Sequence, residues 1–209
     1  LREPLRTITS YCNLLEEDIG DNINEMVKED LKFITDATTR MNILIQDLLQ
    51  LSRAGRVEFE SEKIDLNEII KTVLRDLELK IKETKSNIIC EKLPKILGDY
   101  TQLSRVFQNL FTNAIKFKSN QDPEIKIYSK TLDNFYEIIV EDNGIGIDRE
   151  YQNQIFSAFK RLHSREKYEG TGIGLAICKK IIERHNGTIR IESEVGVGSK
   201  FIISLKKNE

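Results

Sequence analysis

Three polar residues stand at helical spacing in the middle of the sequence, within Asn109-Leu110-Phe111-Thr112-Asn113-Ala114-Ile115-Lys116-Phe117. The steps of four and three residues place Asn109, Asn113 and Lys116 on one face of a helix. An amide carbonyl is a hard oxygen ligand that suits Mg²⁺, which usually takes few protein groups together with phosphate oxygens and waters. A lysine one turn further along can meet the same phosphates. An exposed polar helix face explains this cluster, taken alone, equally well.

Three segments that contain glycines follow. Asp142-Asn143-Gly144-Ile145-Gly146-Ile147 comes after an expected strand, where glycines admit a ligand close to the backbone and a carboxylate can accept the amino proton of adenine. Gly170-Thr171-Gly172-Ile173-Gly174-Leu175 precedes an expected helix, whose N-terminus and backbone N–H groups form an anion site. Gly196-Val197-Gly198-Ser199-Lys200-Phe201 joins the last two strands. Each segment alone is unspecific, because plain turns explain the first and last, and the middle one lacks the Rossmann spacing.

In this order and spacing, the four clusters resemble the Bergerat-type ATP-binding fold shared by histidine kinases, DNA gyrase, the Hsp90 chaperones and MutL proteins. Phe156-Ser157-Ala158-Phe159-Lys160-Arg161-Leu162-His163 looks like the phenylalanine box in the ATP lid of histidine kinases, closest to the phytochrome-like and PAS-linked group. The opening Leu1-Arg2-Glu3-Pro4-Leu5-Arg6 looks like the tail of that family's H-box, His-Asp-Leu-Arg-x-Pro-Leu. The resemblance therefore covers nearly the whole chain.

The resemblance implies a role for each matching residue near the expected polar helix. Asn113 would hold Mg²⁺, and Asn109 would lie beside it in the polyphosphate site. Lys116 would contact phosphate. Asp142 would bind adenine, in a pocket shaped by two glycines, Gly144 and Gly146.

The resemblance also implies roles in the ATP lid. The phosphate cradle and the C-terminal hinge of the lid would be formed by Gly170, Thr171, Gly172, Gly174 and Leu175. Two cations of the lid, Lys160 and Arg161, would add positive charge. Ser199 stands where the family often has threonine, and it keeps the hydroxyl group.

The elements that must position these residues begin with two helices. Apolar residues recur at alternating steps of four and three in both helices, which a break at Gly20-Asp21-Asn22 separates. A single hairpin buries each apolar seam on one side only, so a second copy of the chain is expected to complete a four-helix bundle. A monomeric hairpin packed on the rest of the chain is the alternative. The two seams consist of Leu1, Leu5, Ile8, Cys12, Leu15 and Ile19, and of Val27, Leu31, Ile34, Thr38, Met41, Ile45 and Leu48.

The remainder of the chain mixes helices with strands. The patterns predict helices over 66–84, 100–117 and 172–185, and strands over 88–90, 124–130, 135–141, 188–194 and 200–205. Mostly antiparallel strands covered by helices form an α/β sandwich. We therefore expect an α+β chain: a hairpin over 1–54 that forms a dimeric four-helix bundle, a linker over 55–62, and a Bergerat-type catalytic ATP-binding domain over 63–209.

Composition excludes several function classes. A net charge of −2 gives no reason to expect nucleic acid or an anionic membrane surface as a partner. No apolar run approaches the ~20 residues of a membrane span. Cys12, Cys90 and Cys178 fit neither a disulfide framework nor a zinc site, which suggests reduced thiols and a cytoplasmic setting. The first residue is not Met and no signal peptide is visible, which predicts a piece of a longer protein, whose membrane anchorage stays open.

The acceptor histidine of the H-box is absent from the sequence. The two histidines, His163 in the expected lid and His185 near a helix end, are expected to be a surface residue and a residue favoured by the helix dipole. Matching the H-box to the opening residues places the acceptor two positions before Leu1. The resemblance thus implies an ATP- and Mg²⁺-dependent protein-histidine autokinase that passes the phosphoryl group to an aspartate of a response-regulator receiver domain.

Two other functions stay open at this point. One is an ATPase of the gyrase or MutL type, in which the position of Asn109 is usually a glutamate that activates water. The other is a dimeric scaffold or pseudokinase that binds nucleotide without transferring phosphate. The helical hairpin argues against the first, and the four intact clusters argue against the second.

Overall fold

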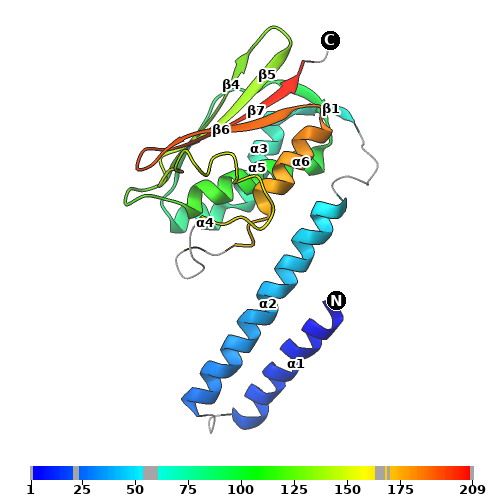
Figure 1. Cartoon of the computed structure of the whole chain (residues 1–209), viewed down its shortest axis with the longest axis vertical. Helices are drawn as coiled ribbons and strands as arrows, with labels where there is room; N and C mark the ends of the chain where they lie inside the picture. Colours follow the sequence, from blue (N-terminus) through cyan, green and yellow to red (C-terminus); the bar gives the residue numbers. More distant parts are fainter. Residues whose placement is uncertain (1, 21–23, 54–60, 163–167, 169, 208–209) are drawn as a thin grey trace. The chain divides into compact units, whose positions relative to one another are not determined.

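The structure is a computed structural model, in which residues 2–20, 24–53, 61–162, 168 and 170–207 are described. The chain divides into two compact units, Leu1–Ser52 and Arg53–Glu209. Figure 1 draws the first as a pair of helices and the second as a sheet with helices against it. Residues 55–60 of the expected linker lie outside the described part, and Glu62, the last residue of that range, begins a strand.

The first unit is a helical hairpin of α1 (Arg2–Ile19) and α2 (Glu25–Arg53), as expected from the two apolar series. Leu5 and Cys12 of α1 and Leu31 and Thr38 of α2 are buried. Thr38 is only 2% exposed, and its hydroxyl lies 3.0 Å from the Thr9 hydroxyl of the other helix. A hydrogen-bonded pair of hydroxyls satisfies polar groups that would otherwise be buried without partners. The pair therefore helps to fix the register of α1 against α2.

Part of each apolar seam remains exposed on the hairpin. A seven-residue period is typical of helices that pack side by side in a bundle. Six of the exposed seam residues follow that period, and we call these six the outer seam: Ile8 and Leu15 on α1, and Val27, Ile34, Met41 and Leu48 on α2. Ile19, at the end of α1, is also exposed but does not continue the period.

The second unit alternates helices and strands. Its helices are α3 (Leu66–Asp76), α4 (Glu78–Glu83), α5 (Tyr100–Lys116) and α6 (Gly174–Arg184). Its strands are β1 (Glu62–Asp65), β2 (Asn87–Cys90), β3 (Lys95–Gly98), β4 (Glu124–Thr131), β5 (Phe135–Asp142), β6 (Thr188–Glu194) and β7 (Gly198–Lys206). No helix in the described ranges is both long and apolar enough to cross a bilayer.

Five strands form one sheet in the order β2-β4-β5-β7-β6, and α3, α5 and α6 lie against one of its faces (Figure 1). All neighbours are antiparallel except β2 and β4, which are parallel. The expected α/β sandwich is confirmed. β1 and β3 form a separate two-stranded ribbon in which Ile64 pairs with Ile96. The sequence did not predict this ribbon, because its strands have four residues each and too few buried positions to show alternation.

Two helix boundaries differ from the expected ones. The helix expected over 66–84 is two helices, α3 and α4, separated at Leu77, whose φ of −97° and ψ of 5° leave the α-helical region. The apolar spacing of Val73, Leu77 and Ile81 continues across the break and so conceals it. α6 begins at Gly174 and not at Gly172, because Gly172 adopts a φ of +74° that a right-handed helix excludes.

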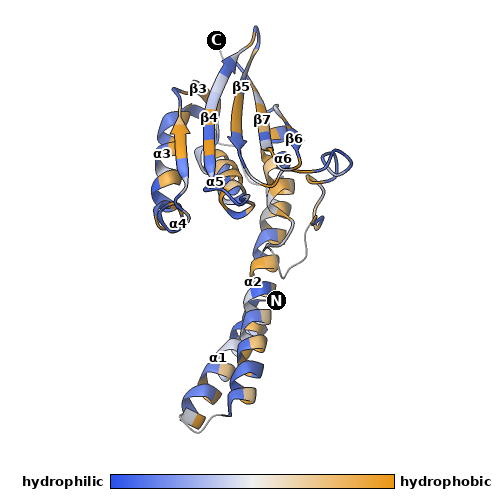
Figure 2. Cartoon of the chain, turned by 90° about the vertical axis from the view of Figure 1, so that its left-hand side faces the viewer, coloured by the Kyte–Doolittle hydropathy of each residue, from blue (hydrophilic) through white to orange (hydrophobic). Residues whose placement is uncertain are grey.

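The core of the second unit lies between the helices and the sheet. Figure 2 shows hydrophobic residues gathered on β4, β5 and β7 and on the sides of α5 and α6. Several large side chains of α5 and of the strands β4 and β5 are almost completely buried, which fixes α5 against the sheet. They are Leu103, Phe107, Leu110 and Phe111 on α5, and Ile125, Ile127 and Ile138 on β4 and β5.

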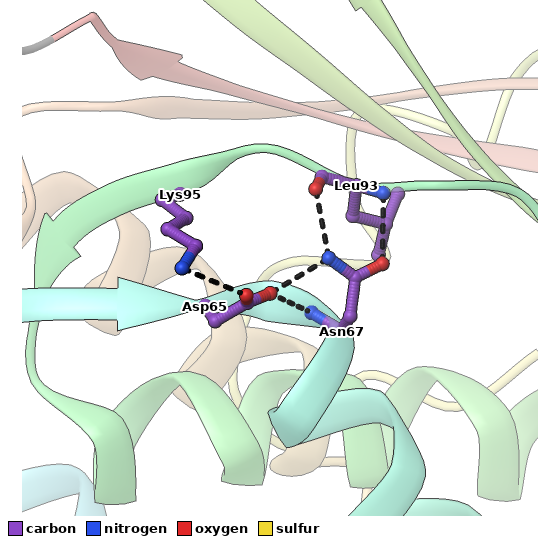
Figure 3. A network of polar contacts seen from close by, with 4 residues as sticks. All are labelled: Asp65, Asn67, Leu93 and Lys95. Carbon is purple, nitrogen blue, oxygen red and sulfur yellow. Dashed lines mark hydrogen bonds and ion pairs between the residues drawn. The ribbon is translucent and has the colours of Figure 1, made fainter.

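The start of α3 is held by a polar network, which Figure 3 shows. Asp65 caps the helix by accepting a 3.0 Å bond from the Asn67 N–H, and Lys95 lies 3.3 Å from the Asp65 carboxylate. The Asn67 side chain donates to the Leu93 carbonyl and accepts from the Leu93 N–H, both at 2.9 Å. One amide side chain therefore joins the segment before β3 to the first turn of α3.

Candidate functional site

The site is built around the C-terminal half of α5. The helix begins where the Asp99 carboxylate accepts the Gln102 N–H at 3.0 Å, and its apolar face is buried in the core. The opposite face carries Asn109, Asn113 and Lys116, all half-buried. The four- and three-residue spacing thus does place these side chains on one side of one helix.

The loop after β5 lies directly against the end of α5. The Ile145 N–H donates to the Phe117 carbonyl at 3.0 Å. A Cβ atom added at Gly144 would lie 2.5 Å from the same carbonyl oxygen, so no residue larger than glycine fits without a shift. The glycine at this position therefore brings the loop that begins with Asp142 onto the helix that carries Asn113.

The Asp142 carboxyl is partly shielded from water at the end of β5. Burial raises its pKa to about 6, although backbone N–H groups of Gly144 and Ser199 donate to the carboxylate and act in the opposite direction, and the nearby Glu141 charge adds to the rise. The Gly144 bond is 2.9 Å long. At neutral pH the group is mostly an anionic acceptor in a confined place, which suits it to take a proton from a ligand N–H.

The segment before α6 meets the polar face of α5. A Cβ atom at Gly174 would lie 2.6 Å from the Asn109 Oδ1 atom, and one at Gly170 would lie 3.1 Å from the Lys116 Nζ atom. Gly170 has a φ of +139° and Gly172 a φ of +74°, conformations that favour glycine. Thr171 and Leu175 lie within the same stretch, Leu175 in the first turn of α6.

A ring contact joins the end of α5 to Tyr168, in the segment expected to be the lid. The Phe117 and Tyr168 ring centroids are 4.9 Å apart, and the Lys116 ammonium lies 4.0 Å from the Phe117 centroid. A cation over an aromatic ring is attracted by the ring's negative face. Lys116 is thus held near Gly170, where the resemblance places phosphate.

The two lid cations lie differently from each other. The Arg161 guanidinium donates to the carbonyl of Tyr168 at 2.7 Å and to that of Gly170. Beside it, the Phe159 N–H donates to the Gly172 carbonyl at 3.0 Å. Lys160 is exposed. Arg161 therefore binds the backbone next to the expected phosphate cradle, a use that its charge alone did not indicate.

The hairpin turn between β6 and β7 packs on the Asp142 loop. A Cβ atom at Gly198 would lie 1.9 Å from the Asp142 carbonyl oxygen, and one at Gly146 would lie 1.9 Å from the Glu194 carbonyl oxygen. The Gly196 N–H donates to the Ile145 carbonyl at 2.9 Å. The fourth cluster is a hairpin turn, which was the simpler of its two interpretations. Its glycines also allow the turn to lie close to the backbone of the Asp142 loop.

Two residues that the sequence did not single out hold this packing in place. The Ser193 hydroxyl accepts the Ile147 N–H at 2.8 Å, donates to the Gly198 carbonyl at 2.7 Å and lies 2.9 Å from the Ser199 hydroxyl. The Gln152 amide donates to the carbonyls of Ile147 and Ser193. No spacing links these residues in the sequence, since the contacts join segments about forty positions apart.

The histidines lie apart from these clusters. His185 follows the last turn of α6, at the opposite end of that helix from Gly174, and is 8% exposed. It lies at the C-terminal end of α6, as expected, but burial lowers its pKa and so disfavours the cation that the helix dipole would attract. His163 lies outside the described residues.

The arrangement brings amide, ammonium and carboxylate groups and the N-terminus of α6 together along α5. Such a set can bind a base through Asp142 and a polyphosphate through Lys116 and the N-terminus of α6. Within the described residues, no three or more His, Cys, Asp or Glu side chains gather as a metal cage. A metal ion would therefore rely on amide oxygens, phosphate oxygens and water, which is the usual preference of Mg²⁺.

Two family profiles match the chain. One, described as the His Kinase A (phospho-acceptor) domain, matches residues 1–56. The other, described as the histidine kinase-, DNA gyrase B- and HSP90-like ATPase, matches residues 98–209. The first profile covers the hairpin and the second covers all four clusters.

Similar whole proteins are longer than this chain. Cyanobacterial phytochrome A of Nostoc sp. is 39% identical over 98% of the chain, which spans 27% of that protein's length. The structure of full-length ShkA in complex with AMPPNP matches 100% of the chain and 44% of its own length, with a TM-score of 0.76 and 22% identity, a likeness of fold. The complex of histidine kinase ThkA with response regulator protein TrrA matches 99% of the chain and 59% of its own, with a TM-score of 0.70 and 25% identity.

Proposed function

The chain belongs to the histidine kinase family, and from that premise we propose that it is the autokinase core of a two-component signalling protein. The second unit binds ATP and presents its γ-phosphoryl group to a histidine on a helix of the bundle. The imidazole nitrogen attacks the γ-phosphorus, the bond to the β–γ bridging oxygen breaks, ADP leaves, and the imidazole proton passes to an acidic neighbour.

The convergence of three clusters on α5 carries this proposal. Asp142 accepts the adenine amino proton, while Lys116 and the N–H groups from Gly170 to Gly174 meet the phosphates. Gly174 contacts Asn109 so closely that a Cβ atom there would lie 2.6 Å from its Oδ1 atom, so glycine is what lets the start of α6 lie against α5. Positioning and charge neutralisation are the main contributions of a protein to phosphoryl transfer.

Asn113 is the residue that we assign to Mg²⁺. The donor set fits the ion: Asn113 and Asn109 supply amide oxygens on the same half-buried helix face as Lys116. Bound with ATP, the ion would neutralise charge on the phosphate oxygens. Asn113 would orient the phosphates through it, and Lys116 would bind them directly.

The hairpin supports a proposed homodimer. The outer seam is exposed on the isolated hairpin, and symmetric packing against the hairpin of a second copy would bury it in a four-helix bundle. The ThkA–TrrA complex, in which a similar kinase binds a response regulator protein, supports a receiver domain as the phosphoryl acceptor. We propose a cytoplasmic location for this part of the protein, and residues 1–54 and 63–209 as its hairpin and catalytic domains.

The rival functions are less well supported. An ATPase needs a base for the attacking water, and the Asn109 amide is a poor one. The four intact clusters argue against a scaffold or pseudokinase, and the test for phosphoryl transfer to an upstream histidine separates it from a kinase. The acceptor histidine is proposed to lie two positions before Leu1, at the first position of the H-box.

Calorimetry with Mg-ATP tests the nucleotide site. We expect Asp142→Asn and Asn113→Asp each to weaken binding strongly, because one removes the anionic acceptor and the other places a carboxylate beside the phosphates. Asn120→Asp, at an exposed position, is the charge-matched control for the second variant and should leave affinity unchanged. Unchanged affinity in both site variants would remove the assignment.

A further inference from the structure

We infer that His185 is a positioning residue for the nucleotide site: its neutral imidazole joins the end of α6 to the start of α5, and protonation opens this joint. The two helices are those that carry the proposed ATP contacts, so the effect on nucleotide affinity rests on the proposed function. The tautomer and protonation state of the imidazole do not depend on that function.

The surroundings of the ring specify one tautomer. The Nε2 atom lies 3.0 Å from the Asp99 backbone N–H, which can only donate, so Nε2 must accept. The Nδ1 atom lies 2.8 Å from the Ile181 carbonyl, which can only accept, so Nδ1 must carry the hydrogen. A Cβ atom at Gly98 would lie 2.9 Å from the ring, so the neighbouring strand is fitted closely to it.

The joint is one end of an antiparallel contact between α5 and α6. At the other end Gly174 approaches Asn109, and midway the Cys178 sulfur lies 3.9 Å from the Val106 carbonyl. From Gly174 to His185 the helix rises about 16 Å. A bond at the far end therefore fixes how the two helices slide against each other, and with it the distance from Asn109 to the phosphate cradle.

Protonation conflicts with this geometry. A second ring hydrogen on Nε2 would face the Asp99 N–H, and the bond that joins the helices would become a repulsion. Burial lowers the pKa of His185, the Ile181 carbonyl and the Asp99 carboxylate raise it, and the Arg184 charge lowers it. The folded pKa lies below the ordinary value of 6.5, so the joint is intact above that pH and weakens as the pH falls below it.

Nitrogen NMR of the whole protein, with ¹⁵N-labelled histidine, tests the imidazole directly. The sequence holds two histidines, so His163→Asn assigns both signals. We expect His185 to be the Nδ1–H tautomer and to titrate below pH 6.5. An Nε2–H tautomer, or a pKa at or above that value, would contradict the inference. His185 itself is unchanged in this measurement, so a folding defect of a His185 variant cannot affect the result.

ATP affinity of two variants tests the positioning. His185→Gln offers an acceptor to Asp99 that does not titrate, whereas His185→Leu offers none and should raise the unfolding constant roughly tenfold by leaving a buried donor without a partner. From about pH 7.5 to 5.5, wild-type affinity should fall by a larger factor than that of His185→Gln, with Asp142 titrating in both. Equal falls would contradict the inference. Absence of ATP binding at pH 7.5 in the wild type would contradict the proposed function and leave the NMR result standing.

Discussion

At the residue scale, Asp142 combines a cost in stability with a gain in binding. Its pKa is about 6 in the folded chain and 3.8 in the ordinary state. Above pH 6 the folded protein therefore keeps a charge that burial disfavours, at a cost of about 3 kcal/mol. This cost decreases as the pH falls through 6 and disappears below 3.8.

Asp142→Asn should therefore raise the melting temperature at pH 7.5 while it weakens ATP binding. The amide oxygen still accepts from the Gly144 and Ser199 N–H groups, but it no longer brings a charge into the site. Thermal unfolding followed at pH 7.5 and at pH 4 checks the sign, since the gain should shrink at the lower pH. Asp122→Asn, at an exposed position, is the control, and a lower melting temperature of Asp142→Asn at pH 7.5 would refute this account of the site.

Some of the site residues could be predicted from residue type and spacing, and others could not. Asn109 and Lys116 could be found because one helix carries them at a fixed spacing, and the glycine segments because close contacts leave glycine as the residue that fits. Ser193 and the backbone bonds of Arg161 could not, because their partners are chosen by tertiary packing. The roles of Asn113 and Lys116 toward a ligand stay predictions.

At the element scale, the network around Asn67 holds the start of α3 against the segment before β3. Asn67→Asp should lower the free energy of unfolding by about 1–3 kcal/mol, because the Leu93 carbonyl loses its donor and a second carboxylate faces Asp65. Urea unfolding of the second unit measures this change. Asn120→Asp adds the same charge at an exposed place and should stay near wild type, so equal loss in both variants would show that the network contributes nothing.

Elements with long periodic patterns could be predicted, and short ones could not. α5 matched its expected range to one residue because seven buried side chains mark its inner face. β1 and β3 could not be predicted separately, because each is recognised by its pairing with the other, in which Glu62 lies opposite Gly98. The apolar spacing continues across the break between α3 and α4 at Leu77, so the residue types there do not predict the break.

At the scale of the whole molecule, the outer seam predicts the dimer. Met41→Glu or Ile34→Glu should shift the protein toward monomer in sedimentation, because a charge buried in a bundle without a partner is costly. Ile43→Glu is the matched control: Ile43 is 46% exposed against 44% for both seam residues, and two residues along the helix from Met41 it lies on another face. A wild-type protein that stays monomeric at high concentration, with its upstream residues present, would count against the bundle.

The most direct measurement is the site of phosphate label after incubation with Mg-ATP carrying a labelled γ-phosphate. The chain from Leu1 should bind ATP without becoming labelled. A chain extended upstream should gain an acid-labile, base-stable phosphoryl group, as expected for a phosphoramidate, and mutation of the histidine two positions before Leu1 should abolish it. A phosphoryl group on serine, on threonine, on His163 or on His185 would contradict the histidine kinase mechanism.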